Sequence, residues 1–179
     1  KKVLKYYELA AIQKNPLAYY NLGILYFEGL YGKPDYEKAK NYFELAAQNK
    51  VFPSCVYLGI IYMFGYGVEK DFSLSKFYLD IAAKQNDPTS LNLLGYFYSS
   101  GVFLDIDINK AIEYYERSTK ITYLQVVNQY LKNNIPILFN YSNSVSYVSF
   151  NNLGLIYITV LNDVEKASED WLSSIPFDF

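Results

Sequence analysis

The sequence repeats itself with a period of 36 residues, and this period constrains the fold more than any other property of the chain. A Leu-Gly pair, a tyrosine, a second glycine, an aspartate and another tyrosine return in the same order and at the same distances. The recurring positions are Gly23, Gly59 and Gly95, Tyr26, Tyr62 and Tyr98, Gly29, Gly65 and Gly101, Asp35, Asp71 and Asp107, and Tyr42, Tyr78 and Tyr114. A period of about 20 to 50 residues is typical of proteins that stack one small structural unit. We therefore expect a repeat architecture.

Each unit is predicted to contain two helices. In the first half, Ala18, Leu22 and Leu25 follow the spacing of one face of a helix. In the second half, Ala39 and Tyr42 begin a second stripe with the same spacing. The fold predicted from these two stripes is all-α, a right-handed α-solenoid of antiparallel helix pairs.

The residues at the ends of these segments support the same helix boundaries. Pro16 and Pro88 stand where first helices begin, and proline is tolerated in a first turn because its missing N–H has no partner there. The aspartates at 35, 71 and 107 are expected to cap the second helices, since a carboxylate accepts hydrogen bonds from free amides of a first turn. The Leu-Gly glycines should let neighbouring helices approach closely, and the recurring tyrosines are expected to fill the space between successive hairpins.

The period also predicts the domain organisation. We expect a single solenoid over residues 1–179, which opens with the second helix of a truncated repeat and closes with a divergent repeat after an insertion. The predicted segments are 1–14 for the truncated repeat, 15–50, 51–86 and 87–122 for three repeats, 123–146 for the insertion, and 147–175 for the divergent repeat.

The second repeat carries the clearest motif, LGIIYMFGYGVEKDFSLSKFYLDIAA, beginning at Leu58. Its pattern, LGxxYxxGxGVxxDxxKAxxYxxxAA, closely resembles the Sel-one-like repeat family, whose members are related to tetratricopeptide repeats. The resemblance covers about residues 1 to 120 and resumes near residue 150. It implies a TPR-like solenoid that acts as a protein-binding adaptor or scaffold, often in membrane-associated or signalling complexes.

The sequence argues against catalysis, a metal or a cofactor. Histidine is absent, which removes the commonest general base and the usual hydrolase triads. Cys55, the single cysteine, therefore has no imidazole base and is expected to be a small apolar helix residue. The glycines of FGYGVEKD lack the Gly-Lys-Ser/Thr ending of a phosphate loop and precede a capping acid. We expect a protein that is not an enzyme.

Charge and composition limit the partners and the compartment. A net charge of −2 gives no general attraction to nucleic acid. Residues 133–162 carry no charge, but Pro136, several asparagines and several serines interrupt that run, so no direct membrane span is expected. A single cysteine favours a reducing compartment such as the cytoplasm. The open end of the truncated repeat offers a surface for self-association.

The predicted binding surface is the concave face of the solenoid, formed by the first helix of each repeat. On those helices we expect apolar and aromatic residues opposite the packing stripe, a composition typical of adaptable protein interfaces. The predicted partner-binding residues are Tyr20, Ile24, Phe27, Val56, Ile60, Met63, Asn92 and Tyr96. Two alternatives remain open. Neighbouring helices or the insertion could cover these residues, and the repeats could position a catalytic or regulatory domain that lies outside this sequence.

Overall fold

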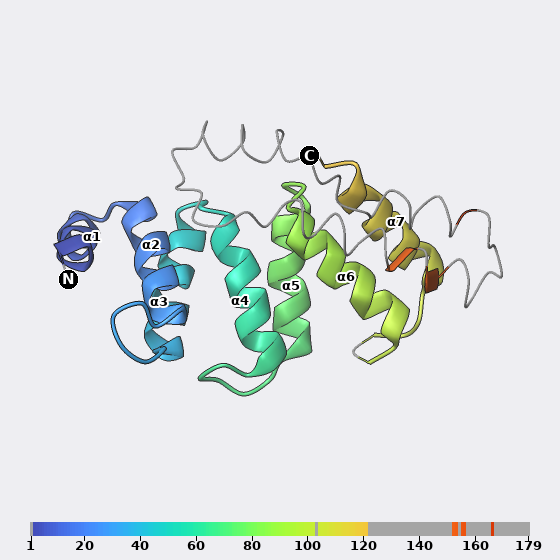
Figure 1. The fold of residues 1–179 in the computed structure, drawn as a ribbon, viewed down its shortest axis with the longest axis horizontal. Coiled ribbons are helices and arrows are strands. Elements are labelled where there is room, and N and C mark those ends of the chain that lie inside the picture. The colour runs from blue at the N-terminus through green and yellow to red at the C-terminus, as the bar shows by residue number, and fades with distance from the viewer. Residues whose placement is uncertain (1, 103, 122–151, 154, 157–165, 167–179) are drawn as a thin grey trace, which may run out of the picture. The chain divides into compact units, whose positions relative to one another are not determined.

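The computed structural model describes residues 2–102, 104–121, 152–153, 155–156 and 166. Seven helices run through residues 2–119, and the described residues contain no strand (Figure 1). The helices are α1 (Lys2–Ile12), α2 (Pro16–Phe27), α3 (Tyr36–Gln48), α4 (Pro53–Phe64), α5 (Phe72–Ala83), α6 (Pro88–Ser100) and α7 (Ile108–Thr119). The predicted all-α fold of packed helix pairs is confirmed.

The chain forms two compact units, Lys1–Gln85 and Asn86–Phe179. The first unit holds α1 to α5, in which each helix packs against the next one from α1 to α5. The second unit holds α6 and α7, which pack against each other. The predicted insertion at 123–146 and most of the predicted repeat at 147–175 lie outside the described residues.

The second helix of each pair begins at a capping aspartate, as predicted. A side-chain oxygen of Asp35 accepts a hydrogen bond from the amide of Lys38 at 3.1 Å, and Asp71 and Asp107 make the equivalent bonds at 2.8 and 3.1 Å. The amide of each aspartate donates to the carbonyl of a tyrosine at the end of the preceding helix, at 2.9 Å in all three pairs. The hydrogen bond from the Lys38 amide lowers the pKa of Asp35. One residue therefore both caps a helix and closes the loop before it.

The helix ends also follow the period. Gly65 and Gly101 end α4 and α6 in the left-handed conformation, which glycine adopts without steric cost. The second helices are followed by non-glycine residues with positive φ, namely Lys14, Lys50 and Asn86 at 59°, 63° and 57°. Since these three residues lie 36 apart, one turn geometry recurs even where glycine is absent.

A glycine in each first helix allows the two helices of a pair to approach closely. A β-carbon at Gly23 would lie 2.5 Å from the Phe43 ring, and one at Gly59 would lie 2.7 Å from Leu79. Gly95 and Tyr115 form the same contact in the second unit, at 2.7 Å. Real β-carbons do not approach other atoms so closely, so the predicted packing role of these glycines is confirmed.

The recurring tyrosines stack inside each hairpin. The rings of Tyr26 and Tyr42 lie 5.7 Å apart with planes 9° from parallel. Tyr62 with Tyr78, and Tyr98 with Tyr114, repeat this stack at 5.8 Å. The sequence pattern predicted contacts between successive hairpins, and for these ring pairs that prediction is wrong. The two positions lie on facing sides of one antiparallel helix pair, so the rings meet there.

Candidate protein-interaction site

The structure buries most of the residues predicted to bind a partner. Tyr20, Ile24, Val56, Met63 and Asn92 are buried, and Ile24 is only 1% exposed. Phe27 and Ile60 are half-buried, and Tyr96 is exposed. We call this set of eight residues the first-helix face.

Several buried members of the face contribute to packing. Val56 joins Cys55 and Ala82 in a core cluster, against which Ile60 packs. In the second unit, the Asn92 side chain lies 3.5 Å from the side-chain nitrogen of Asn152, which donates to it. Binding at the first-helix face therefore has to involve its more exposed members and their neighbours.

Phe27 is the centre of an aromatic group in the first unit. Its ring lies 5.4 Å from the rings of Tyr36 and Tyr57 and 5.9 Å from that of Tyr66, all in edge-to-face geometry. Tyr36 and Tyr66 stack at 4.7 Å, and Phe64 stacks on Tyr66 at 5.5 Å. We call these five residues, Phe27, Tyr36, Tyr57, Phe64 and Tyr66, the aromatic cluster.

The aromatic cluster joins two successive hairpins. Phe27 and Tyr36 flank the loop between α2 and α3, whereas Phe64 and Tyr66 lie at the end of α4. Gly67, with φ of 68°, lies against Tyr36, where a β-carbon would be 3.1 Å from the tyrosine β-carbon. The positive φ and the absence of a side chain at Gly67 therefore let the loop between α4 and α5 reach the start of α3.

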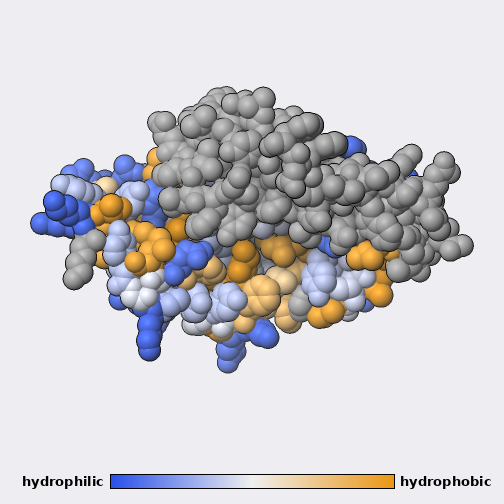
Figure 2. Space-filling model, in the orientation of Figure 1, coloured by the Kyte–Doolittle hydropathy of each residue, from blue (hydrophilic) through white to orange (hydrophobic). Residues whose placement is uncertain are grey.

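The aromatic cluster is partly accessible. Four of its rings are half-buried, and Phe64 is 48% exposed. Figure 2 shows hydrophobic residues exposed on the visible face over α2 and over α4 and α5. Aromatic side chains offer large contact areas with few torsions to fix, so ordering them in a complex costs little entropy. The sequence did not identify Tyr36, Tyr57, Phe64 and Tyr66, although aromatic residues beside loop glycines were a visible signal.

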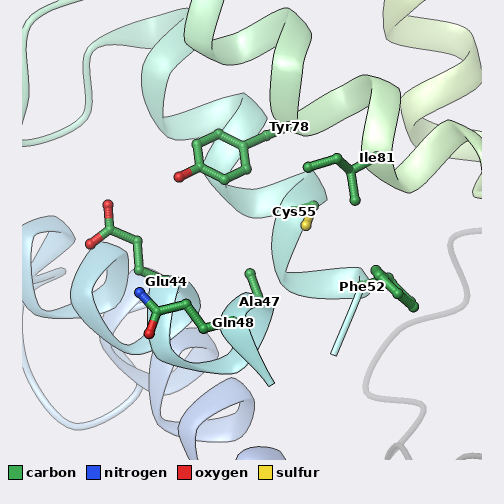
Figure 3. A pocket seen from close by; sticks show the side chains of 7 residues that line it. All are labelled: Glu44, Ala47, Gln48, Phe52, Cys55, Tyr78 and Ile81. Atoms are coloured by element: carbon green, nitrogen blue, oxygen red, sulfur yellow. The ribbon is translucent and has the colours of Figure 1, made fainter. Parts of the chain in front are cut away.

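A second feature is a surface hollow between α3, α4 and α5, with a volume of about 490 Å³ (Figure 3). Figure 3 shows the Tyr78 hydroxyl pointing toward the side of the hollow that carries Glu44. The lining residues are Glu44, Ala47, Gln48, Phe52, Cys55, Tyr78 and Ile81. The sequence did not predict this hollow, although an acid recurs every 36 residues at Glu44, Asp80 and Glu116.

The Glu44 carboxylate of the hollow already has two partners. Glu44 forms an ion pair with Lys40 at 3.0 Å, and the Tyr62 hydroxyl lies 3.5 Å from the same carboxylate. Burial, and secondarily the charge of Glu44, raises the pKa of Tyr78. Burial raises the pKa of the Cys55 thiol to about 11. The thiol is therefore protonated at neutral pH and is a poor nucleophile.

Among the residues that the structure describes, no three acidic or cysteine side chains are grouped so that they could hold a metal ion. Within the same residues, no helix has both the length and the apolar character needed to cross a membrane.

The sequence comparison identifies the repeat. A family model described as Sel1 repeat matches residues 16–51, 53–87 and 88–120, which is more than half of the chain. These matches confirm the resemblance seen in the sequence. Among curated proteins, none matches the chain.

Two solved structures are similar to the chain. One is c5321, a protective antigen present in uropathogenic Escherichia coli strains that displays an SLR fold, with 26% identity and a TM-score of 0.63. The comparison covers 96% of this chain but 40% of that one. The other is a Sel1 repeat protein from Oxalobacter formigenes, with 22% identity, a TM-score of 0.64, and coverage of 96% of this chain and 75% of that one. Both comparisons support the repeat fold.

Proposed function

Because the chain belongs to the Sel1 repeat family, we propose that it is a non-catalytic scaffold that binds a peptide or protein partner through its first-helix face. Sel1 repeats commonly serve as protein-interaction scaffolds and are generally non-catalytic. In the first unit, the proposed contact region is the aromatic cluster, which includes Phe27 of that face.

The exposed ring of Phe64 carries this proposal. It is 48% exposed although it stacks on Tyr66, which in turn stacks on Tyr36. A large apolar ring that is already held by its neighbours loses little freedom when a partner covers it. The aromatic cluster offers a partner both apolar ring faces and tyrosine hydroxyls that can donate or accept hydrogen bonds.

Charge has a small part in the proposed contact. The five members of the aromatic cluster are uncharged phenylalanine and tyrosine side chains. Aromatic enrichment together with depletion of charge is typical of the centre of a protein interface. We therefore expect a partner segment with apolar side chains, whose binding changes little between low and moderate salt.

The test compares Phe64→Asp with Phe77→Asp in affinity capture from native extract. Phe77 is a matched control because it is 56% exposed and lies on α5, outside the aromatic cluster. We expect Phe64→Asp to lose a specific partner that the parent chain and Phe77→Asp both retain. Circular dichroism should show that both variants are folded. If both variants retain the same partners, or both lose them, the aromatic cluster is not the binding surface.

A further inference from the structure

Helix α1 presents a face with apolar and aromatic side chains. This open face of α1 consists of Val3, Tyr6, Tyr7 and Ala10, which lie at i, i+3, i+4 and i+7 and so share one side of the helix. Val3 is 50% exposed and Tyr6 is 69% exposed, whereas Tyr7 and Ala10 are half-buried. No residue of α1 is fully buried.

In the other second helices, the positions equivalent to Val3, Tyr7 and Ala10 are buried and the position equivalent to Tyr6 is half-buried. Thirty-six residues further on, Phe43 takes the place of Tyr7, and Leu79 and Tyr115 take it in the next two helices. All three are essentially inaccessible to solvent. The small residues equivalent to Val3 and Ala10 are also buried in every pair: Ala39 and Ala46, Ser75 and Ala82, and Ala111 and Ser118.

One kind of element covers these positions in all three pairs. It is the first helix of the pair, whose glycine packs on the position equivalent to Tyr7. Its tyrosine, three residues later, stacks on the position equivalent to Tyr6. In the third pair the covered residue is Tyr115, so a tyrosine at this position fits against such a glycine.

α1 is held in place by contacts on another side. It packs against α2, and Leu4 and Ala11, which lie outside the open face, are half-buried. The equivalent contact joins α3 to α4 in the following hairpin. α1 therefore contacts α2, the next helix in the chain, just as α3 contacts α4. Its open face corresponds to the side on which the other second helices contact the first helix of their own pair.

We propose that the open face of α1 binds one further helix with the chemistry of a first helix, with a glycine against Tyr7 and a tyrosine against Tyr6. The helices α2, α4 and α6 cannot supply it without unpairing, because each already covers α3, α5 or α7. A helix bound at this face repeats the contact between first and second helices that occurs in all three pairs. This inference is independent of the aromatic cluster, none of whose five residues lies on α1.

The experiment supplies such a helix in register. A copy of residues 15–36 is joined directly before Lys1 of the full chain, which places the copied Gly23 as far ahead of Tyr7 as Gly23 is ahead of Phe43. The control carries Gly23→Leu in the copy alone, so that its side chain blocks the close approach. The readouts are the melting temperature and amide exchange in α1.

We expect the glycine graft to raise the melting temperature by about 5 °C and to slow amide exchange in α1 by about 10-fold or more. The leucine graft should give neither effect. A second graft with Tyr6→Ala should lose part of the gain, and that substitution alone should not unfold the ungrafted chain because Tyr6 is exposed. Equal effects from the glycine and leucine grafts, or no effect from either, would overturn the proposal. Sedimentation showing that the ungrafted chain dimerises through α1 would assign the face to a second copy and would also overturn it.

Discussion

The ring of Phe43 packs directly over the α-carbon of Gly23, where no side chain separates α2 from α3. The same relationship holds between Gly59 and Leu79 and between Gly95 and Tyr115. The three covering side chains differ in shape, but the glycine is present each time. The close approach of two helices, rather than one particular side-chain pairing, is therefore the constant feature of the repeat.

This contact predicts the effect of Gly23→Ala. The added methyl group would overlap the Phe43 ring, and overpacking of this kind costs about 1–3 kcal/mol. Alanine regains up to about 1 kcal/mol of helix propensity, so we expect a net loss of about 1–2 kcal/mol in the free energy of unfolding. Urea denaturation would measure it. Gly32→Ala is the control, because nothing lies within 4 Å of a β-carbon there, and an equal loss in both variants would contradict the packing role.

A second prediction concerns the turn after α3. Lys50 has φ of 63°, a conformation that costs a non-glycine residue about 1 kcal/mol or more. Lys50→Gly is expected to raise the free energy of unfolding by about 0.5–1 kcal/mol, since glycine adopts this conformation freely. Lys84→Gly is the matched control: Lys84 has a right-handed φ of −62°, so glycine should destabilise there. Thermal melts that shift in the same direction for both variants would contradict the account.

The sequence predicted the repeat, its helices and its caps because these depend on local signals that recur in register. Asp35, for example, needs only its position before a helix to act as a cap. The sequence did not predict the burial of Ile24, because periodicity tells which residues share a face but not what covers that face. α2 packs against both α1 and α3, which leaves it little free surface.

The aromatic cluster was missed for a related reason. Tyr36 and Tyr66 are 30 residues apart and stack only because two loops meet across successive hairpins. The divergent repeat at 147–175 stays a prediction. Of the described residues in that segment, Leu153 and Ile156 join Ala111 and Tyr115 in a core cluster.

A third prediction concerns the reactivity of Cys55. The thiol is buried, and burial raises its pKa to about 11, so little thiolate exists at pH 8. We expect a thiol reagent such as DTNB to label the folded chain at least about 100-fold more slowly than the chain in denaturant. Rapid labelling of the folded chain at pH 8 would show that the thiol is accessible and ionised, contrary to the structure.

A fourth prediction is a loss of stability at alkaline pH. Burial raises the pKa of Tyr115, with hydrogen bonds to Ser99 and Asn152 acting in the opposite direction. Above pH 10 the unfolded tyrosine loses its proton while the folded one keeps it, so the free energy of unfolding falls as pH rises.

Tyr115→Phe should remove this contribution, so its stability should fall less steeply than that of the parent chain between pH 10 and 11, by up to about 1.4 kcal/mol per pH unit. Tyr31→Phe, at an exposed loop position, is the control and should follow the parent chain. Denaturant midpoints at several pH values provide the measurement. Identical slopes for all three proteins would contradict the assigned role of Tyr115.

Site-specific photo-crosslinking shows whether the aromatic cluster contacts a partner. A photoreactive phenylalanine analogue replaces Phe64 in one chain and Phe77 in another, and both are irradiated in native extract. We expect a discrete crosslinked species from position 64, which is absent at position 77 and is reduced when Phe27→Ala is added. Crosslinks of equal yield from both positions, or from position 77 alone, would contradict it.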